Sequence, residues 1–311
     1  MIAHDIALKI IFFSQTLVGV VGNSFLLGLY IITFFAGSRL RTIDMILTHL
    51  SFVNILVLLS KGIPQTMAAF GLNNFLDDIG CKFVFYFHRV ARGLSLCTTS
   101  FLSGFQAITI SPGSSRWAKI KPRVQKYMVP FCLFCWVLHM GSNGPILVYM
   151  KGPKGHKNTT SILDFDFCSV LFNPSFSTTI SAFIIFLHDI TCLIIMMWTS
   201  GSMVLVLYRH RQRVQYIRGS NLFSRPSLET RATQSILMLV GIFVFFNLIN
   251  SVLTVYVQFA KTKLWLLNVS AFLAACFPAC SPFVLIFSDS QVSTYYLIIR
   301  EKIKLPSFID Y

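Results

Sequence analysis

Two stretches of the sequence place ionisable side chains inside long apolar runs. The first contains His88, Arg89 and Arg92, and the second contains His188 and Asp189. An arginine at the centre of a membrane-spanning helix costs about 2.5–3.5 kcal/mol on the insertion scale, so such side chains face a partner or a wet cavity rather than lipid. One aspartate cannot neutralise two arginines and a histidine. We therefore predict a ligand pocket here, with a salt bridge that only fixes helix packing as the alternative.

The first group shares one face of a helix. Residues at i, i+3 or i+4 and i+7 lie on the same side, and this spacing aligns Phe85 with Arg92 and with either His88 or Arg89. Asp189 is expected to pair with one arginine. The excess positive charge favours an anionic or hydrogen-bond-accepting ligand, for example a sulfated steroid. The predicted pocket residues are Phe85, His88, Arg89, Arg92, His188 and Asp189.

Two of the eight cysteines differ from the others in their surroundings. Cys81 begins an apolar run, and Cys168 lies in a polar segment between two later runs. The other six lie within apolar runs and are interpreted as small buried hydrophobic residues. Disulfides persist in oxidising compartments. If both segments face the outside of the cell, a Cys81–Cys168 bond is expected to tie this segment over the mouth of the bundle; the alternative is two unrelated thiols.

The polar segment that contains Cys168 also carries a glycosylation motif. Asn158-Thr159-Thr160 matches the N-glycosylation pattern Asn-x-Ser/Thr. We expect Asn158 to carry a glycan on the outer face. A second match begins at Asn268 inside an apolar run, where the membrane would bury it, and is not expected to be modified.

Long apolar runs must position all of these residues. Hydrophobic residues make up 55% of the chain and charged residues 12%, well below the roughly 25% charged of a soluble domain. A helix needs about 20 mostly apolar residues to cross the hydrocarbon core. Seven runs meet this requirement, and they cover residues 10–35, 43–70, 82–111, 127–150, 178–208, 232–259 and 264–288. The sequence predicts an all-α membrane protein in which residues 1–311 form a single bundle of seven transmembrane helices.

The net charge of +15 is concentrated on one side of this bundle. Nearly all of it falls in the first, third and fifth connecting segments. Lys and Arg gather in cytoplasmic loops, so the N-terminus is expected outside and the C-terminus in the cytoplasm. The basic segments then face the anionic inner leaflet of the lipid bilayer, and no nucleic-acid binding is expected.

Other functional classes fit the sequence less well. It lacks the zinc-binding His-Glu-x-x-His, the Gly-x-Ser-x-Gly elbow and the phosphate loop. We therefore expect no enzymatic activity, no cofactor and no bound metal. A transporter or channel is the alternative function. Transporters often have two repeated halves, and the odd number of runs argues against such a repeat. A transporter or channel also needs a polar path across the whole membrane, whereas the ionisable residues here occupy only the outer half of the runs.

Several strings resemble the framework of rhodopsin-like G-protein-coupled receptors in a divergent form. Gly22-Asn23, Trp136 and the string beginning Ser281-Pro282 match that framework. The third run ends in Ala107-Ile108-Thr109-Ile110-Ser111 where most relatives have an acid–arginine–tyrosine triplet, and the sixth run lacks their tryptophan–proline pair. This combination is similar to the vomeronasal type-1 receptors, a family of candidate pheromone receptors, and the resemblance covers essentially the whole chain.

The resemblance implies a multi-pass chemosensory receptor of the plasma membrane of vomeronasal neurons. Such a receptor binds a small pheromone-like ligand and activates a heterotrimeric G protein of the inhibitory class. Without the triplet, activation is not expected to use the usual arginine switch. The cytoplasmic basic segments, residues 116–126 and 209–231, are expected to be loops that face the G protein. The predicted contact residues are Arg116, Lys119, Lys121, Arg209, Arg211 and Arg213.

Overall fold

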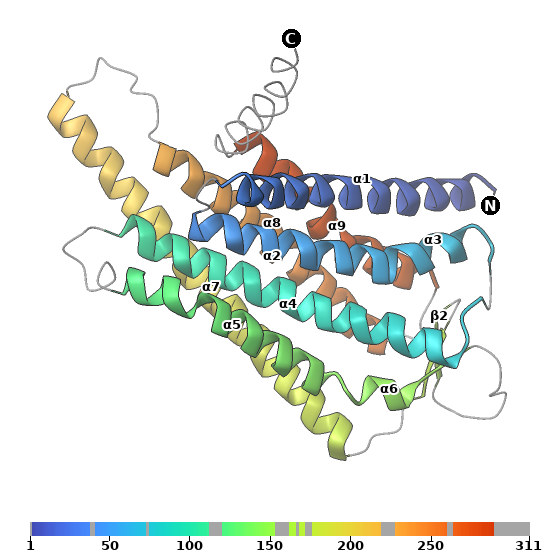
Figure 1. Ribbon diagram of the computed structural model, residues 1–311. Helices are drawn as coiled ribbons and strands as arrows, with labels where there is room; N and C mark the ends of the chain where they lie inside the picture. Colours follow the sequence, from blue (N-terminus) through green and yellow to red (C-terminus); the bar gives the residue numbers. More distant parts are fainter. Residues whose placement is uncertain are drawn as a thin grey trace, which may run out of the picture.

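The computed structural model describes residues 2–37, 41–72, 75–111, 120–152, 162–165, 168–171, 176–218, 228–259 and 264–288. In these ranges, long helices lie side by side in one bundle (Figure 1). The helices are α1 (Ile2–Phe35), α2 (Thr42–Val57), α3 (Ile63–Ala69), α4 (Asp78–Ile110), α5 (Lys121–Ser142), α6 (Ile146–Tyr149), α7 (Phe176–Arg218), α8 (Leu228–Phe259) and α9 (Leu264–Ser288). A π-helical turn, η1 (Leu58–Gly62), joins α2 to α3 without a break. Each of the seven predicted runs therefore lies mainly in one long helix or helical rod, which confirms the predicted helix bundle.

Five of these helical segments are long and apolar enough to cross a membrane. They are Lys9–Phe35, Thr42–Ala69, Lys126–Val148, Phe183–Arg209 and Asn268–Ile286. The apolar part of α8 is shorter, Ile236–Ile249. Helix α4 falls outside the set because polar residues are spread along its length, and many of them turn towards its neighbours. Its buried polar residues are His88, Ser95, Thr98, Thr99, Ser100, Ser103 and Gln106.

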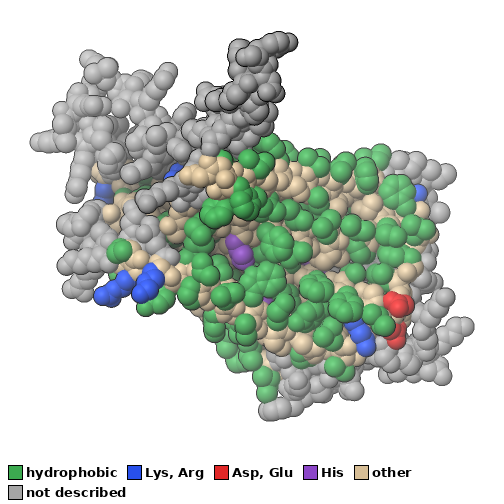
Figure 2. All heavy atoms as spheres, in the orientation of Figure 1, with side chains coloured by type: hydrophobic (Ala, Val, Ile, Leu, Met, Phe, Trp, Pro, Cys, Tyr) green, Lys and Arg blue, Asp and Glu red, His purple; other side chains and the backbone are tan. Residues whose placement is uncertain are grey.

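The outer surface of the bundle is apolar. Large hydrophobic side chains on α5 and α7 are well exposed, among them Val137 (72%) and Trp198 (74%). Figure 2 shows hydrophobic side chains covering much of the described face, with charged side chains near its two ends. Soluble monomers rarely expose apolar patches of this extent. This surface is therefore the one that lipid covers.

Polar side chains join the helices inside the bundle. The Asn23 amide of α1 donates to the Pro278 carbonyl of α9 at 2.8 Å. The Asn54 amide of α2 donates to Ser281 Oγ of α9 at 2.9 Å, and Ser95 Oγ of α4 donates to Asn54 Oδ1 at 3.1 Å. Where lipid cannot supply hydrogen bonds, such contacts hold helices together.

The first and last helices pack closely through small residues. A Cβ added at Gly22 of α1 would lie 2.8 Å from the Pro282 ring of α9. At the end of the π-helical turn, a side chain at Gly62 would collide with Thr16 of α1. Gln65 of α3 donates through Nε2 to Asn268 Oδ1 of α9 at 2.9 Å. Contacts along its whole length therefore fix the α2–η1–α3 rod against α1 and α9.

A small antiparallel sheet covers one end of the bundle (Figure 1). It contains β1 (Met150–Lys151), β2 (Ile162–Phe165) and β3 (Cys168–Leu171) in the order β1-β3-β2. Cys168 of β3 is bonded to Cys81 of α4, with 5.8 Å between their Cα atoms, which confirms the predicted disulfide. We call this the disulfide end.

The helix in the predicted fourth run, residues 127–150, is interrupted near its end. Helix α5 ends at Ser142, and the short helix α6 and strand β1 follow. Asn143, Gly144 and Pro145 separate α5 from α6, and Pro145 disfavours helical backbone in the residue before it. The chain therefore turns out of the helix, although the hydrophobic sequence continues.

Candidate functional site

A cavity lies between α2, α4, α8 and α9. It encloses about 370 Å³ of space free of atoms, part of it open to the surroundings. Its polar lining residues are Arg92 and Ser95 of α4 and Asn247 of α8. The other lining residues are Val57, Phe243, Phe246, Leu273, Ala274, Phe277 and Pro278. A mainly apolar lining with a few placed polar groups is the usual composition of small-molecule sites.

Positive charge gathers on the α2–α4 side of this cavity. Arg92 is half-buried, and no hydrogen bond or ion pair is recorded for it among the described residues. The buried ring of His88 lies close enough to three positive charges to feel each of them. These charges belong to Lys61 of η1 and to Arg89 and Arg92 of α4. His88 Nδ1 is buried without a hydrogen-bond partner in the described structure. An anion in the cavity would therefore meet the Arg92 guanidinium, with Lys61 close enough for the two positive charges to interact.

The predicted pocket residues divide into separate groups. Arg92 lines the cavity and His88 lies near it. Arg89 is exposed on the surface of the bundle. Phe85 instead packs in the apolar cluster that contains the disulfide and Met150 of β1.

His188 and Asp189 of α7 do not line this cavity. Asp189 Oδ1 lies 3.3 Å from His188 Nδ1. The charges of Asp189 and Arg89 act on each other, but the described residues show no ion pair between Asp189 and an arginine. The expected aspartate–arginine pair is therefore not formed, because the adjacent histidine takes the carboxylate.

The cavity residues of α8 and α9 were not anticipated from the sequence. Amides inside a membrane, such as that of Asn247, often bridge two helices. Its amide instead donates to the Phe243 carbonyl one turn earlier in α8, at 2.9 Å. An aromatic ring at i and an amide at i+4 lie on one face of a helix. This spacing of Phe243 and Asn247 in an apolar run is the sequence feature that could have indicated their shared position in the cavity.

The described part of α7 that carries Arg209, one of the predicted G-protein contacts, runs towards the end of the bundle opposite the sheet (Figure 1). Helix α7 continues to Arg218, past the predicted run end at 208, so the expected loop at 209–231 is partly wrong: residues 209–218 and 228–231 are helical. In Figure 1 this part of α7 extends beyond the neighbouring helices. Arg209 is exposed.

Several predicted site residues lie beyond what the structure describes. Arg116, Lys119 and Asn158 lie outside the described residues. Lys121, Arg211 and Arg213 lie in described helices, but their side chains do not belong to the described part. Their proposed roles depend on the sequence and on the course of the helices alone.

A hydrogen bond joins α4 to α8 near the place where the charged triplet was expected. Gln106 Nε2 donates to Thr233 Oγ1 at 3.0 Å, and both residues are buried. Gln106 stands one residue before the string Ala107-Ile108-Thr109 that replaces the triplet. A neutral pair therefore connects the two helices here.

Comparison with known proteins agrees with this architecture. A profile of the vomeronasal organ pheromone receptor family matches residues 6–297. Vomeronasal type-1 receptor 1 of Gorilla gorilla gorilla is 45% identical over 292 residues, which cover 94% of this chain and 82% of that receptor. Vomeronasal type-1 receptor 3 of Homo sapiens is also 45% identical, and the match covers 94% of each chain.

A more distant relative and a solved structure extend the comparison. Olfactory receptor class A-like protein 1 of Danio rerio is 32% identical, over 90% of this chain and 89% of that protein. The crystal structure of squid rhodopsin superposes with a TM-score of 0.71 at 16% identity, covering 94% of this chain and 84% of that one. At this identity the likeness establishes the fold alone. Together with the family profile and the 45% identical relatives, it shows that the chain belongs to the vomeronasal type-1 receptor family and is a chemosensory G-protein-coupled receptor, multi-pass in the plasma membrane.

Proposed function

We propose that this receptor binds a small anionic or strongly hydrogen-bond-accepting ligand in the cavity between α2, α4, α8 and α9, and then activates a G protein of the inhibitory class. The observation that carries the proposal is the position of Arg92 in the cavity. This residue is half-buried in the cavity wall, and no counter-ion is recorded for it among the described residues. A guanidinium group matches the geometry of a sulfate or carboxylate with two parallel hydrogen bonds.

The rest of the lining suits a ligand with an anionic head and an apolar body. Asn247 on α8 offers a second polar group opposite Arg92 of α4, and aromatic rings such as Phe243 and Phe277 line the space with them. A sulfated steroid has this combination of groups. The enclosed part of the cavity, about 30 Å³, is much smaller than an ordinary ligand site, so the helices or the aromatic rings must move apart to admit such a ligand.

Ligand binding would act on the contact between α4 and α8. Arg92 and Gln106 are 14 residues apart on α4, about 21 Å along its axis at about 1.5 Å per residue. The ligand touches both helices at the first position, and the Gln106–Thr233 hydrogen bond joins them at the second. We infer that a ligand-driven shift of α8 against α4 breaks this bond and opens the far end of the bundle.

The open end would receive the G protein. The disulfide supports an extracellular position for the sheet, because such bonds persist in oxidising compartments. Asn158 would then carry its glycan outside. The opposite end would lie in the cytoplasm, where the helical extension of α7 carries basic residues. The proposed contact residues are Arg116, Lys119, Lys121, Arg209, Arg211 and Arg213.

The proposal is tested in cells that express the full receptor with a G-protein reporter. Matched sulfated and unsulfated steroids are applied to wild type, Arg92→Gln and Lys82→Gln. Lys82 is the matched control, because it lies on the same helix and does not line the cavity. We expect Arg92→Gln to need at least about tenfold more sulfated ligand, since a charge-assisted hydrogen bond contributes about 1.5–3 kcal/mol. Lys82→Gln should respond like wild type.

Two results would count against the proposal. An Arg92→Gln receptor with normal surface expression and an unchanged response would show that the ligand binds elsewhere. A response that persists after pertussis toxin, which blocks inhibitory-class coupling, would contradict the proposed G protein without affecting the pocket.

A further inference from the structure

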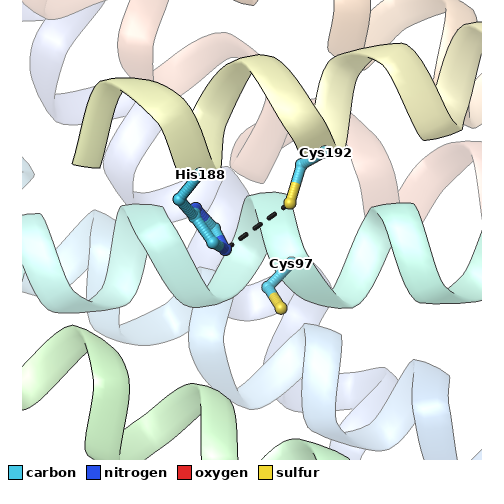
Figure 3. Close-up of side chains that lie close together, drawn as sticks. All are labelled: Cys97, His188 and Cys192. Atoms are coloured by element: carbon cyan, nitrogen blue, oxygen red, sulfur yellow. Dashed lines mark hydrogen bonds between the residues drawn. The ribbon is translucent and has the colours of Figure 1, made fainter. Parts of the chain in front are cut away.

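Helices α4 and α7 bring three metal-ligating side chains together (Figure 3), and none of them lines the cavity. Cys97 comes from α4, and His188 and Cys192 come from α7, one turn apart. Their two sulfur atoms and an imidazole nitrogen all lie within 4.8 Å of one another. Both thiols are buried and His188 is half-buried. Three ligands of the kinds that zinc and softer metal ions prefer therefore meet in one place.

His188 and Cys192 already stand at the separation of a chelating pair. His188 Nε2 lies 3.5 Å from Cys192 Sγ. A tetrahedral zinc ion bonded to nitrogen at about 2.05 Å and to sulfur at about 2.3 Å would hold these two atoms about 3.6 Å apart. Two zinc-bound sulfurs would be about 3.8 Å apart, so Cys97 Sγ, already within 4.8 Å of both atoms, would need to move by about 1 Å or less.

The other imidazole nitrogen of His188 has the partner that metal sites usually provide. Asp189 Oδ1 lies 3.3 Å from His188 Nδ1. A metal-bound histidine commonly donates its second N–H to a carboxylate, which fixes the ring orientation and leaves the ligating nitrogen unprotonated. A proton on Nδ1 facing Asp189 would leave the Nε2 lone pair directed towards Cys192.

Helix α5 adds two further donor groups beside the cluster. Cys135 packs with Cys97 in the same apolar cluster. The ring of His139 stands edge-on to that of His188, with 4.6 Å between ring centroids. His139 Nε2 is buried without a hydrogen-bond partner in the described structure. Since buried polar atoms are normally satisfied, this nitrogen or the Cys135 thiol is a candidate fourth ligand.

We propose that Cys97, His188 and Cys192 bind one zinc ion between α4 and α7. Each thiol loses its proton on binding, so one Zn²⁺ and two thiols give a neutral zinc–dithiolate centre and two released protons. This neutralisation matters inside a bundle, where an uncompensated charge is costly. Mixed sulfur and nitrogen ligands are typical of tetrahedral zinc sites. The ion would link the two helices through coordinate bonds on one side of α4, while the ligand cavity lies on another.

The proposal is tested on the full-length receptor purified in detergent, stripped with a chelator and titrated with zinc chloride. Bound zinc is measured by atomic absorption, and cobalt chloride is used separately for its thiolate-to-metal charge-transfer absorption. Wild type should bind one zinc ion and show the cobalt band. Cys97→Ser and Cys192→Ser should each lower zinc affinity by at least about 100-fold, and Asp189→Asn by about 10- to 100-fold.

Cys280→Ser is the matched control, because it removes a free thiol on α9 outside the cluster. This variant should bind zinc like wild type. If the serine variants do not fold, His188→Gln keeps both thiols and should still lose zinc. Zinc binding that is absent in wild type, or equal in wild type and His188→Gln, would overturn the proposal. None of these measurements requires a ligand or a G protein, so they test the metal site separately from the proposed function.

Discussion

Replacing Gly93 by alanine tests how closely α4 packs against α5 beside the two histidines. A Cβ at this position would collide with Cε1 and Nδ1 of the His139 ring. His139 is only 2% exposed, and His188 packs against it edge-on. The ring therefore has little space into which it can move away from a new methyl group.

The expected loss of stability is the difference between two opposing effects. Alanine in place of glycine in a helix stabilises by about 0.8–1 kcal/mol. Overpacking of a well-packed interior typically costs about 1–3 kcal/mol, and a collision with a rigid ring belongs in the upper part of that range. We expect Gly93→Ala to lower the free energy of unfolding by about 1–2 kcal/mol.

Gly104 provides the matched control on the same helix, because a Cβ there meets no heavy atom within 4 Å. Gly104→Ala should be neutral or slightly stabilising. The assay is thermal unfolding of the purified receptor in detergent. The double variant Gly93→Ala/His139→Ala should be more stable than the sum of the single effects predicts, since removing the ring relieves the collision. A Gly93→Ala receptor at least as stable as Gly104→Ala would refute the reasoning.

Three further predictions concern signalling and processing. Gln106→Ala removes the hydrogen bond to Thr233, which contributes about 1 kcal/mol. Ligand-independent reporter activity should therefore rise about fivefold. Unchanged basal activity would show that this bond does not stabilise the inactive state over the active one. Neutralising Arg209, Arg211 and Arg213 together should weaken G-protein activation while surface labelling stays normal, and full-strength signalling would place the coupling surface elsewhere. Asn158→Gln should migrate faster than wild type on a gel and lose its sensitivity to glycosidase; identical migration before and after the enzyme would contradict glycosylation.

The sequence predicts the helices well where an apolar run has no competing signal. The run 264–288 coincides with helix α9, Leu264–Ser288. The disulfide was also predictable, because the distribution of basic residues placed Cys81 and Cys168 on the same side of the membrane. The end of α5 was missed because Gly144-Pro145 interrupts a stretch whose hydrophobicity does not change.

The site was harder to predict, because periodicity describes one helix at a time. It correctly places Arg92 on a buried face of α4, but it does not show whether α7 or α8 lies opposite. In the structure, Arg92 and Asn247 of α8 both line the cavity. The group Cys97, His188 and Cys192 was missed for the same reason. Its members are spread over two helices, and each cysteine alone is an ordinary buried residue.

The π-helical turn η1 places one extra residue in the α2–η1–α3 rod without changing the direction in which α3 faces. A π turn accommodates one residue more than an α turn, whereas one residue added to a regular α-helix rotates everything after it by about 100°. Deleting one residue within Leu58–Gly62 would therefore restore an α turn and leave both α2 and α3 facing their present neighbours. Gln65 would keep its hydrogen bond to Asn268, and Asn54 would keep its hydrogen bonds to α4 and α9. Deleting one residue before Asn54 in the regular helix α2 would instead rotate the rod beyond the deletion and separate both side chains from these partners.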